Sequence, residues 1–323
     1  MIMNNNVFKT LFIPAVACLL GACAESTDPD METSGNSGAI RFAGPAVTRG
    51  AIDDADGMQV AGNSFSVWGN YTDGAGGTAT SVFNAEKVTY VSGMWGYEGT
   101  RYWLAGKTYD FYALYPSTEM LGDGVPVACT ADGTFTVKGF DATKGHDLMT
   151  AEQTGIVIEA GKVPEAVSFK FFHQLTRLAF NVKAVGRDVT VTSFKVNGVI
   201  RKGDLTHTAE GTSKWSHTTT TTADDGLLAA SDVGVASGET QDMLGDVLLP
   251  PHADLTGTEI AVSYRFEGET ADRSSTVSLS GGSVEQWNAG SRYAYTLTVS
   301  TASLEIKVKV LDWDEEDTSV SWN

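Results

Sequence analysis

Short alternating segments separated by glycine-rich turns run through most of this chain, and they constrain its fold more than any other feature. In Ser64–Trp68, Ile260–Phe266 and Ser275–Leu279, apolar and polar residues alternate as in strands with one buried face, and the last two segments are predicted to pair as a hairpin. Helix periodicity is nearly absent, and only Asp147–Ala151 is predicted to form a single helical turn. Many short strands, with 35 glycines available for turns, predict an all-β chain built from β-sandwiches.

The strands form two groups, and the glycine- and proline-containing loop Gly161–Pro164 separates them. We therefore expect an N-terminal β-sandwich over residues 39–162 and a C-terminal β-sandwich over residues 163–302. Residues 303–323 are expected to form a strand appendage.

The first 38 residues indicate export rather than part of the folded body. The apolar run from Leu11 to Leu20 is too short to span a bilayer but suits a secretory signal, so residues 1–22 are predicted to be a signal peptide. The run ends in Leu20-Gly21-Ala22-Cys23, which resembles a bacterial lipobox and makes the Cys23 thiol the predicted site of acylation, with palmitate among the acyl groups. The alternative is an ordinary secretory signal in which Cys23 is incidental. The polar stretch 23–38 is predicted to be a flexible tether.

Composition supports an extracytoplasmic protein. The chain has 40 acidic and 22 basic residues, a net charge of −18, which argues against nucleic acid and anionic membrane surfaces as partners. After processing, only Cys23 and Cys129 would remain, so no disulfide is expected within one chain. We expect an outer-membrane lipoprotein whose stability comes from packed sheets.

Two segments near the ends of the mature chain are predicted to be strands because apolar and polar residues alternate in them. Ile40 and Phe42 alternate with polar neighbours, and Arg49-Gly50 shortly afterwards is a site where a trypsin-like protease would cut an exposed loop. Near the other end, Leu304–Val310 alternates without error: Leu304, Ile306, Val308 and Val310 form one apolar face, and charged residues form the other. The alternative interpretation of this second segment is an ordinary last strand.

Taken together, these pieces resemble the fimbrillin family of lipoprotein-derived pilins (Mfa-like and FimA-like, type V pili). The residues that carry the resemblance are the lipobox ending at Cys23, Ile40–Phe42 with Thr48–Gly50, Phe65–Gly69, Tyr102–Trp103, Tyr109–Pro116, Asp147–Met149, Phe169–Thr176, Trp287–Gly290 and Leu311–Trp313. The resemblance implies two transthyretin-like Greek-key β-sandwich domains, lipoprotein export, proteolysis after an arginine and strand exchange between subunits of a fimbrium that serves cell adhesion.

On this resemblance, the strand carrying Ile40 and Phe42 is a placeholder that cleavage between Arg49 and Gly50 releases. A groove left open in this way can be completed by a strand from a neighbouring subunit. We expect Leu304, Ile306, Val308 and Val310 to be the apolar residues of that donor strand. Expected partners are other fimbrillin subunits, either copies of this chain or anchor and tip proteins, the outer-membrane lipid through Cys23, and a host glycan or protein. An uncleaved anchor or tip subunit is the alternative role.

Catalysis and cofactors are not expected. The histidines, at positions 146, 173, 207, 217 and 252, do not have metal-ligand spacing, and the acidic stretch Asp53–Gly57 lacks the last ligand of a calcium loop. We therefore expect no enzyme, no cofactor and no metal site. At Phe172-His173 the alternation of the preceding residues changes phase, which predicts a bulge or kink that turns His173 inward as a hydrogen-bonded core residue.

One rival interpretation concerns the aromatic residues of the first half. Trp68, Tyr71, Trp95, Tyr97, Tyr102 and Trp103 are numerous enough for a platform on which sugar rings would stack, as on a glycan-binding surface lipoprotein. The alternative is that these rings fill the core of the first sandwich, which a domain without disulfides needs.

Overall fold

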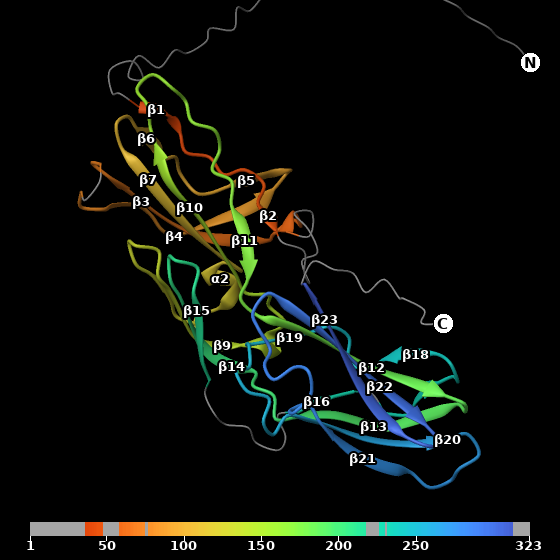
Figure 1. Ribbon diagram of the computed structural model, residues 1–323. Coiled ribbons are helices and arrows are strands. Elements are labelled where there is room, and N and C mark those ends of the chain that lie inside the picture. The colour runs from red at the N-terminus through yellow and green to blue at the C-terminus, as the bar shows by residue number, and fades with distance from the viewer. Residues whose placement is uncertain (1–35, 48–57, 75–76, 218–225, 230, 313–323) are drawn as a thin grey trace, which may run out of the picture. The chain divides into compact units, whose positions relative to one another are not determined.

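The computed structural model describes residues 36–47, 58–74, 77–217, 226–229 and 231–312. Within these ranges the chain is almost entirely β-structure, and the helical elements with both ends described are the short α2 (Thr118–Leu121) and η1 (Ala142–Lys144) (Figure 1). Neither described helix is long and apolar enough to cross a membrane. The predicted all-β class is therefore confirmed.

The first half of the chain is built around a seven-stranded sheet. Its strands, in spatial order, are β2 (Ala46–Val47), β11 (Lys170–His173), β10 (Met149–Val157), β7 (Thr108–Tyr115), β3 (Ser64–Thr72), β4 (Thr80–Val91) and β5 (Met94–Gly96). A separate two-stranded sheet pairs β1 (Asn36–Ala39) with β6 (Tyr102–Leu104). All these pairs are antiparallel except β2 with β11, which is parallel.

An aromatic core lies on one face of the seven-stranded sheet. Phe65, Phe111 and Trp103 are fully buried there, and the Trp103 ring of β6 meets the Phe111 ring of β7 edge-on at 5.7 Å between centroids. Alternation in β3 and β7 sends Trp68 and Tyr112 to the opposite face, where they join a second core. The central strands are thus covered on both sides, which explains why β7 is buried over most of its length.

The second half forms two five-stranded sheets that share the second core. One has the order β18 (Thr240–Asp242), β12 (Thr176–Val185), β22 (Ser291–Ser300) and β23 (Leu304–Asp312), with β19 (Val247–Leu249) also on β12. The other has the order β16 (Leu227–Leu228), β13 (Val189–Asn197), β20 (Glu259–Phe266) and β21 (Arg273–Ser278), with β17 (Val233–Val235) also on β13. The Phe180 ring of β12 packs 6.3 Å from the Phe194 ring of β13, so side chains of the two sheets meet face to face. The predicted hairpin of β20 and β21 is confirmed.

A four-stranded sheet combines strands from both sides of the loop Gly161–Pro164. Its order is β15 (Ser213–His217), β14 (Lys202–His207), β9 (Phe135–Asp141) and β8 (Val127–Cys129). Gln174 adds polar links nearby: its amide nitrogen donates to Thr150 Oγ1 at 2.7 Å, and its backbone oxygen accepts from Trp215 Nε1 at 3.0 Å. The strands before and after the loop are therefore interleaved.

Two local predictions are wrong. Asp147–Ala151 does not form a helical turn, because Met149–Ala151 begin β10 and pair with β7 and β11. The chain has no bulge at Phe172-His173 either: β11 alternates regularly, with Phe171 and His173 buried and Phe172 turned outward. Plain strand geometry thus brings His173 into the interior.

Candidate functional site

The segment 40–46 packs against the core of the seven-stranded sheet through part of its side chains. Ile40 and Phe42 are 1% and 5% exposed, and both belong to the aromatic core of the seven-stranded sheet. The intervening Arg41 is exposed, so the predicted alternation is present in the structure. Two apolar side chains therefore anchor this segment.

The Phe42 ring sits among aromatic side chains from several strands. Its centroid lies 5.5 Å from that of Phe83 and 5.7 Å from that of Tyr97, both edge-on, and 5.9 Å from the stacked ring of Phe169. Edge-on and offset contacts of this kind each add to the burial energy. Phe42 therefore fills a space that belongs to the core, and its removal would open a cavity.

Main-chain hydrogen bonds hold the segment on both sides. On one side, the Ile40 amide donates to the Arg101 carbonyl at 2.8 Å. On the other, the Val167 amide donates to the Arg41 carbonyl, and Ala43 and Ala46 donate to the carbonyls of Val167 and Phe169, each at 2.8 Å. The segment thus lies as a strand-like insert between the chain before β6 and the chain leading into β11, parallel to the latter.

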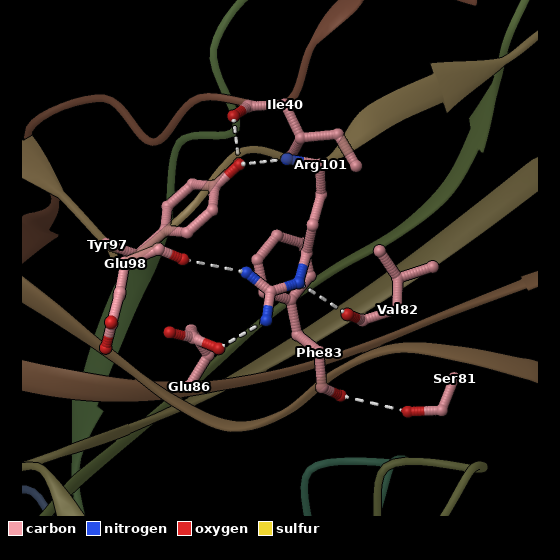
Figure 2. A network of polar contacts seen from close by, with 8 residues as sticks. All are labelled: Ile40, Ser81, Val82, Phe83, Glu86, Tyr97, Glu98 and Arg101. Atoms are coloured by element: carbon pink, nitrogen blue, oxygen red, sulfur yellow. Dashed lines mark hydrogen bonds and ion pairs between the residues drawn. The ribbon is translucent and has the colours of Figure 1, made fainter.

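Tyr97 and Arg101 form a clamp over the start of this insert (Figure 2). The Tyr97 hydroxyl donates to the Ile40 carbonyl at 2.8 Å and accepts from the Arg101 amide at 3.2 Å. Burial raises the pKa of Tyr97, so the hydroxyl keeps the proton that it donates. We call these two residues the Tyr97–Arg101 clamp.

The Arg101 guanidinium fixes the clamp to the sheet. It donates to the Val82 carbonyl at 2.9 Å and the Glu98 carbonyl at 3.2 Å, and it pairs with the Glu86 carboxylate at 2.5 Å. Its central carbon lies 4.6 Å from the Phe83 ring centre, within cation–π range. As Figure 2 shows, strand β4 and the loop before β6 are tied together beside Ile40.

No sequence pattern pointed to Tyr97 and Arg101 in this role. Both contact Ile40 through its main chain, which leaves no signature in side-chain periodicity. The contact also depends on a register between segments far apart in the chain, which composition does not encode.

The other predicted N-terminal residues, Cys23, Arg49 and Gly50, lie outside the described residues. The described chain runs to Val47 in β2, so Arg49 follows two residues after this strand. The predicted cut therefore falls directly after the insert in the sequence.

The segment Leu304–Val310 lies in β23, at one end of its five-stranded sheet. It pairs antiparallel with β22 along its whole length, from Leu304 opposite Val299 to Asp312 opposite Ser291. Leu304, Ile306 and Val308 are half-buried against the second core, and Val310 is 54% exposed. Ile306 and Val308 also line a hollow of about 340 Å³ beside Leu279 and Val284. The inward face of β23 is therefore only partly packed within its own subunit.

Burial decides the question of the aromatic platform. Trp68, Trp95 and Trp103 are all buried, and Tyr71 and Tyr97 are half-buried against the first core. Tyr102, at 42% exposed, is the most accessible of the six. The sugar-stacking platform is thus wrong for these residues, because the three indoles that it needs are core side chains.

Two of the histidines are core residues with polar partners. His173 is buried beside Asp147, with Nδ1 2.9 Å from a carboxylate oxygen, as a core histidine with a polar partner. His252 accepts from the Ile200 amide at Nε2 (2.7 Å) and bonds the Pro250 carbonyl through Nδ1 (2.9 Å), and burial lowers its pKa to about 4. In the described ranges, no three His, Cys, Asp or Glu residues gather as metal ligands would.

Comparison with known proteins agrees with this architecture. A family model described as fimbrillin-like matches residues 48–313, and the chain therefore belongs to the fimbrillin-like family, as the sequence motifs predicted. A Bacteroides uniformis protein that carries the name "Putative fimbrium subunit Fim1C" is 28% identical over 213 residues. That alignment spans 63% of this chain and 61% of the relative's length.

Solved structures show the same fold. A fimbrial protein from Bacteroides vulgatus superposes with a TM-score of 0.62 at 18% identity, over 85% of this chain and 99% of that one. A Bacteroides uniformis protein described as a "putative cell adhesion protein" gives a TM-score of 0.52 at 22% identity, with the same coverage of both chains.

Proposed function

We propose that this protein is a fimbrial subunit that reaches the cell surface as a lipoprotein and assembles by strand exchange, serving cell adhesion. In this proposal, residues 1–22 direct export, Cys23 carries the lipid in the outer membrane, and residues 23–38 tether the folded body. The body consists of two transthyretin-like Greek-key sandwiches, at 39–162 and 163–302, with β11 of the second range paired into the sheet of the first. The strand appendage 303–323 follows. Its partners are other subunits of the fimbrium. Membership of the fimbrillin-like family supports this role.

The observation that carries the proposal is the buried insert at Ile40 and Phe42. Segments that merely precede a domain are usually loose and exposed. This one supplies two core side chains and four main-chain hydrogen bonds, and the predicted cleavage site at Arg49-Gly50 follows it. An insert that a single cut would detach is what a placeholder strand requires.

The free energies that hold the insert in place are of a size that allows it to be displaced. Burying two such side chains stabilises by about 3–6 kcal/mol, and five hydrogen bonds, including that of Tyr97, add about 5 kcal/mol. Ordering eight backbone positions, 40–47, costs about 8–16 kcal/mol. Once cut from the body, the insert is therefore held only marginally, and a strand with more apolar anchors would replace it.

Strand β23 fits the role of that replacement. It offers Leu304, Ile306, Val308 and Val310 on one face, against two anchors on the insert. In its own subunit this face is only partly packed, so transfer into a complete groove would bury more apolar surface. The Tyr97–Arg101 clamp bonds the main chain, so it would accept a donor of different sequence.

The test is to treat the exported protein with an arginine-specific protease and examine it by SDS gel without boiling. We expect a product beginning at Gly50 and a ladder of SDS-resistant multimers. Arg49→Ala is the matched control and should abolish both. Deletion of residues 303–323 should keep the cleavage and abolish the ladder. A ladder that survives the deletion would remove the donor role from β23, and a native protein that begins at an acylated Cys23 would favour an uncleaved anchor.

A further inference from the structure

Two histidine rings meet where the four-stranded sheet contacts the sheet of β12 and β22. His217 is the last residue of β15, and His252 lies three residues after β19 ends. Their ring centroids are 5.9 Å apart. His252 is 2% exposed, and its ring also packs against the Trp287 indole with 4.7 Å between centroids. A titratable pair thus lies at a junction between two sheets.

Both nitrogens of the His252 ring bond main-chain groups. Nε2 accepts a hydrogen bond from the Ile200 amide at 2.7 Å. Because Nε2 is an acceptor, the ring proton of the neutral side chain is on Nδ1, which donates to the Pro250 carbonyl at 2.9 Å. Ile200 lies in the connection from β13 to β14. The neutral imidazole therefore bridges two segments that are far apart in the chain.

The turn after β19 depends on these side chains because it begins with two prolines. Pro250 and Pro251 have no amide hydrogen, so neither can hold the turn in place through its own N–H. Their carbonyls instead accept from imidazoles, that of Pro250 from His252 and that of Pro251 from the His217 ring. His252 and Trp287 exchange two main-chain hydrogen bonds, at 3.0 and 2.8 Å, on the other side. We call His217 and His252 the histidine clasp.

Adding a proton to the clasp removes a bond that it makes. The free lone pair of neutral His252 is the one on Nε2, so the imidazolium would direct an N–H at the Ile200 N–H. Burial, and to a lesser extent a charge on His217, lower the pKa of His252 to about 4, although the bond to the Pro250 carbonyl raises it. Burial also lowers the pKa of His217. Acid therefore favours a form in which these rings are released to water.

Other charged side chains lie on the segments that form the clasp: Arg201, Lys202, Lys214, Asp254 and Glu285. Lys214 and Glu285 are exposed. Arg201 donates to a main-chain carbonyl, Asp254 accepts from a main-chain amide, and Lys202 pairs with a carboxylate. Tyr295, which accepts from the Trp287 indole, stays neutral because burial raises its pKa to about 12. The titratable group that faces His252 is thus His217, which can add only a charge of the same sign.

We propose that the histidine clasp is an acid-sensitive link between the four-stranded sheet and the sheet of β12 and β22, and that protonation loosens it. The parts that it frees are the turn 250–255 and the connection 198–201, while the cores of both halves stay folded. This inference does not use the proposed role in a fimbrium, so the two can fail separately.

Hydrogen exchange of the full chain, followed by mass spectrometry at pH 7.5 and pH 5.0, tests the clasp. Each rate is divided by the intrinsic rate of the free peptide at that pH, so that only protection is compared. Protection of peptides that contain the amides of Ile200, His252 and Trp287 should fall on the order of tenfold at pH 5.0. The reason is that the opened form binds its proton with the ordinary pKa of 6.5 and the closed form with a pKa of about 4.

Strand β7 provides the internal reference, because it lies between both cores and exchanges through unfolding of the whole. At pH 5.0 the clasp peptides should still exchange at least about tenfold faster than β7. Equal rates would overturn the proposal, because acid would then unfold the chain as a unit. Equal protection of the clasp peptides at both pH values would overturn it as well.

Histidine substitutions identify the groups that titrate. His252→Gln should reduce the effect of pH to less than about threefold, because the amide can donate and accept but does not take up a proton. His217→Gln changes a half-buried ring and should give an intermediate effect, which keeps the test decisive if His252→Gln does not fold. The matched control, His146→Gln, lies outside the clasp and should retain the effect seen in wild type. An effect of full size in either clasp variant would overturn the proposal.

Discussion

Truncation of Phe42 tests most simply whether the insert is part of the core. The ring is 5% exposed and packs against Phe83, Tyr97 and Phe169 at 5.5 to 5.9 Å between centroids. Replacing a buried phenylalanine by alanine removes its transfer free energy and leaves a cavity, which together cost about 3–5 kcal/mol. We therefore expect Phe42→Ala to lower the free energy of unfolding by about that amount.

The assay is urea unfolding, followed by tryptophan fluorescence. Trp95 and Trp103 are in the same core and report on its packing. The matched control is Arg41→Ala, whose exposed side chain points out of the sandwich, and it should change stability by less than about 0.5 kcal/mol. A loss below about 1 kcal/mol for Phe42→Ala, similar to that for Arg41→Ala, would refute the reasoning, because the segment would then be a loose flap.

Three further predictions concern stability. Tyr97→Phe removes the clamp hydroxyl and should cost about 1–2 kcal/mol, whereas the exposed Tyr102→Phe should be neutral in the same urea assay. The folded-state pKa of His252 is about 4, below the unfolded value of 6.5, so the unfolded chain binds the proton first as pH falls. The stability that neutral His252 contributes is fully present above pH 6.5, and the free energy of unfolding should fall by about 3 kcal/mol between pH 6.5 and 4. His252→Gln should make this fall smaller, and pH profiles that run parallel for wild type and variant would contradict the prediction. Gly198 has φ +74°, and a Cβ added there would lie 2.2 Å from a backbone oxygen. Gly198→Ala should therefore lower the melting temperature more than Gly186→Ala, whose added Cβ has no close neighbour and costs only the left-handed backbone penalty of about 1–2 kcal/mol. Equal melting temperatures for these two variants would contradict that account.

The fold class was readable from the sequence because most strands have one buried and one exposed face. In β20, burial alternates residue by residue, as the sequence pattern does. The pattern failed at β10, where Met149, Thr150 and Ala151 are all buried between β7 and β11. When both faces of a strand are covered, apolar residues occupy both, and the sequence shows no alternation from which the strand could be predicted.

The predicted bulge at Phe172-His173 was wrong for a different reason, although His173 is buried as predicted. Phe172 is strongly apolar and follows the apolar Phe171, so the alternation of apolar and polar residues was interpreted as shifting by one residue there. In the structure its ring lies outward, 5.1 Å from the Lys170 ammonium, where a cation–π contact accompanies the exposed ring. Hydrophobicity alone does not separate such a residue from a buried one.

The candidate site was only partly predictable. Ile40, Phe42 and the alternating residues of β23 were visible as patterns in single segments. The Tyr97–Arg101 clamp arises from registers between distant segments. Such registers depend on the whole packing of the sheets, which no local window contains.

The central claim is that one groove holds the chain's own insert before cleavage and a neighbour's β23 afterwards. Incorporating a photo-crosslinking amino acid at position 97, whose native tyrosine bonds the Ile40 carbonyl at 2.8 Å, allows the occupant to be identified by mass spectrometry. Before treatment with the arginine-specific protease, we predict crosslinks to residues 36–47 of the same chain, and afterwards to residues 304–312 of a second copy. Crosslinks that remain on residues 36–47 in SDS-resistant multimers would contradict the account.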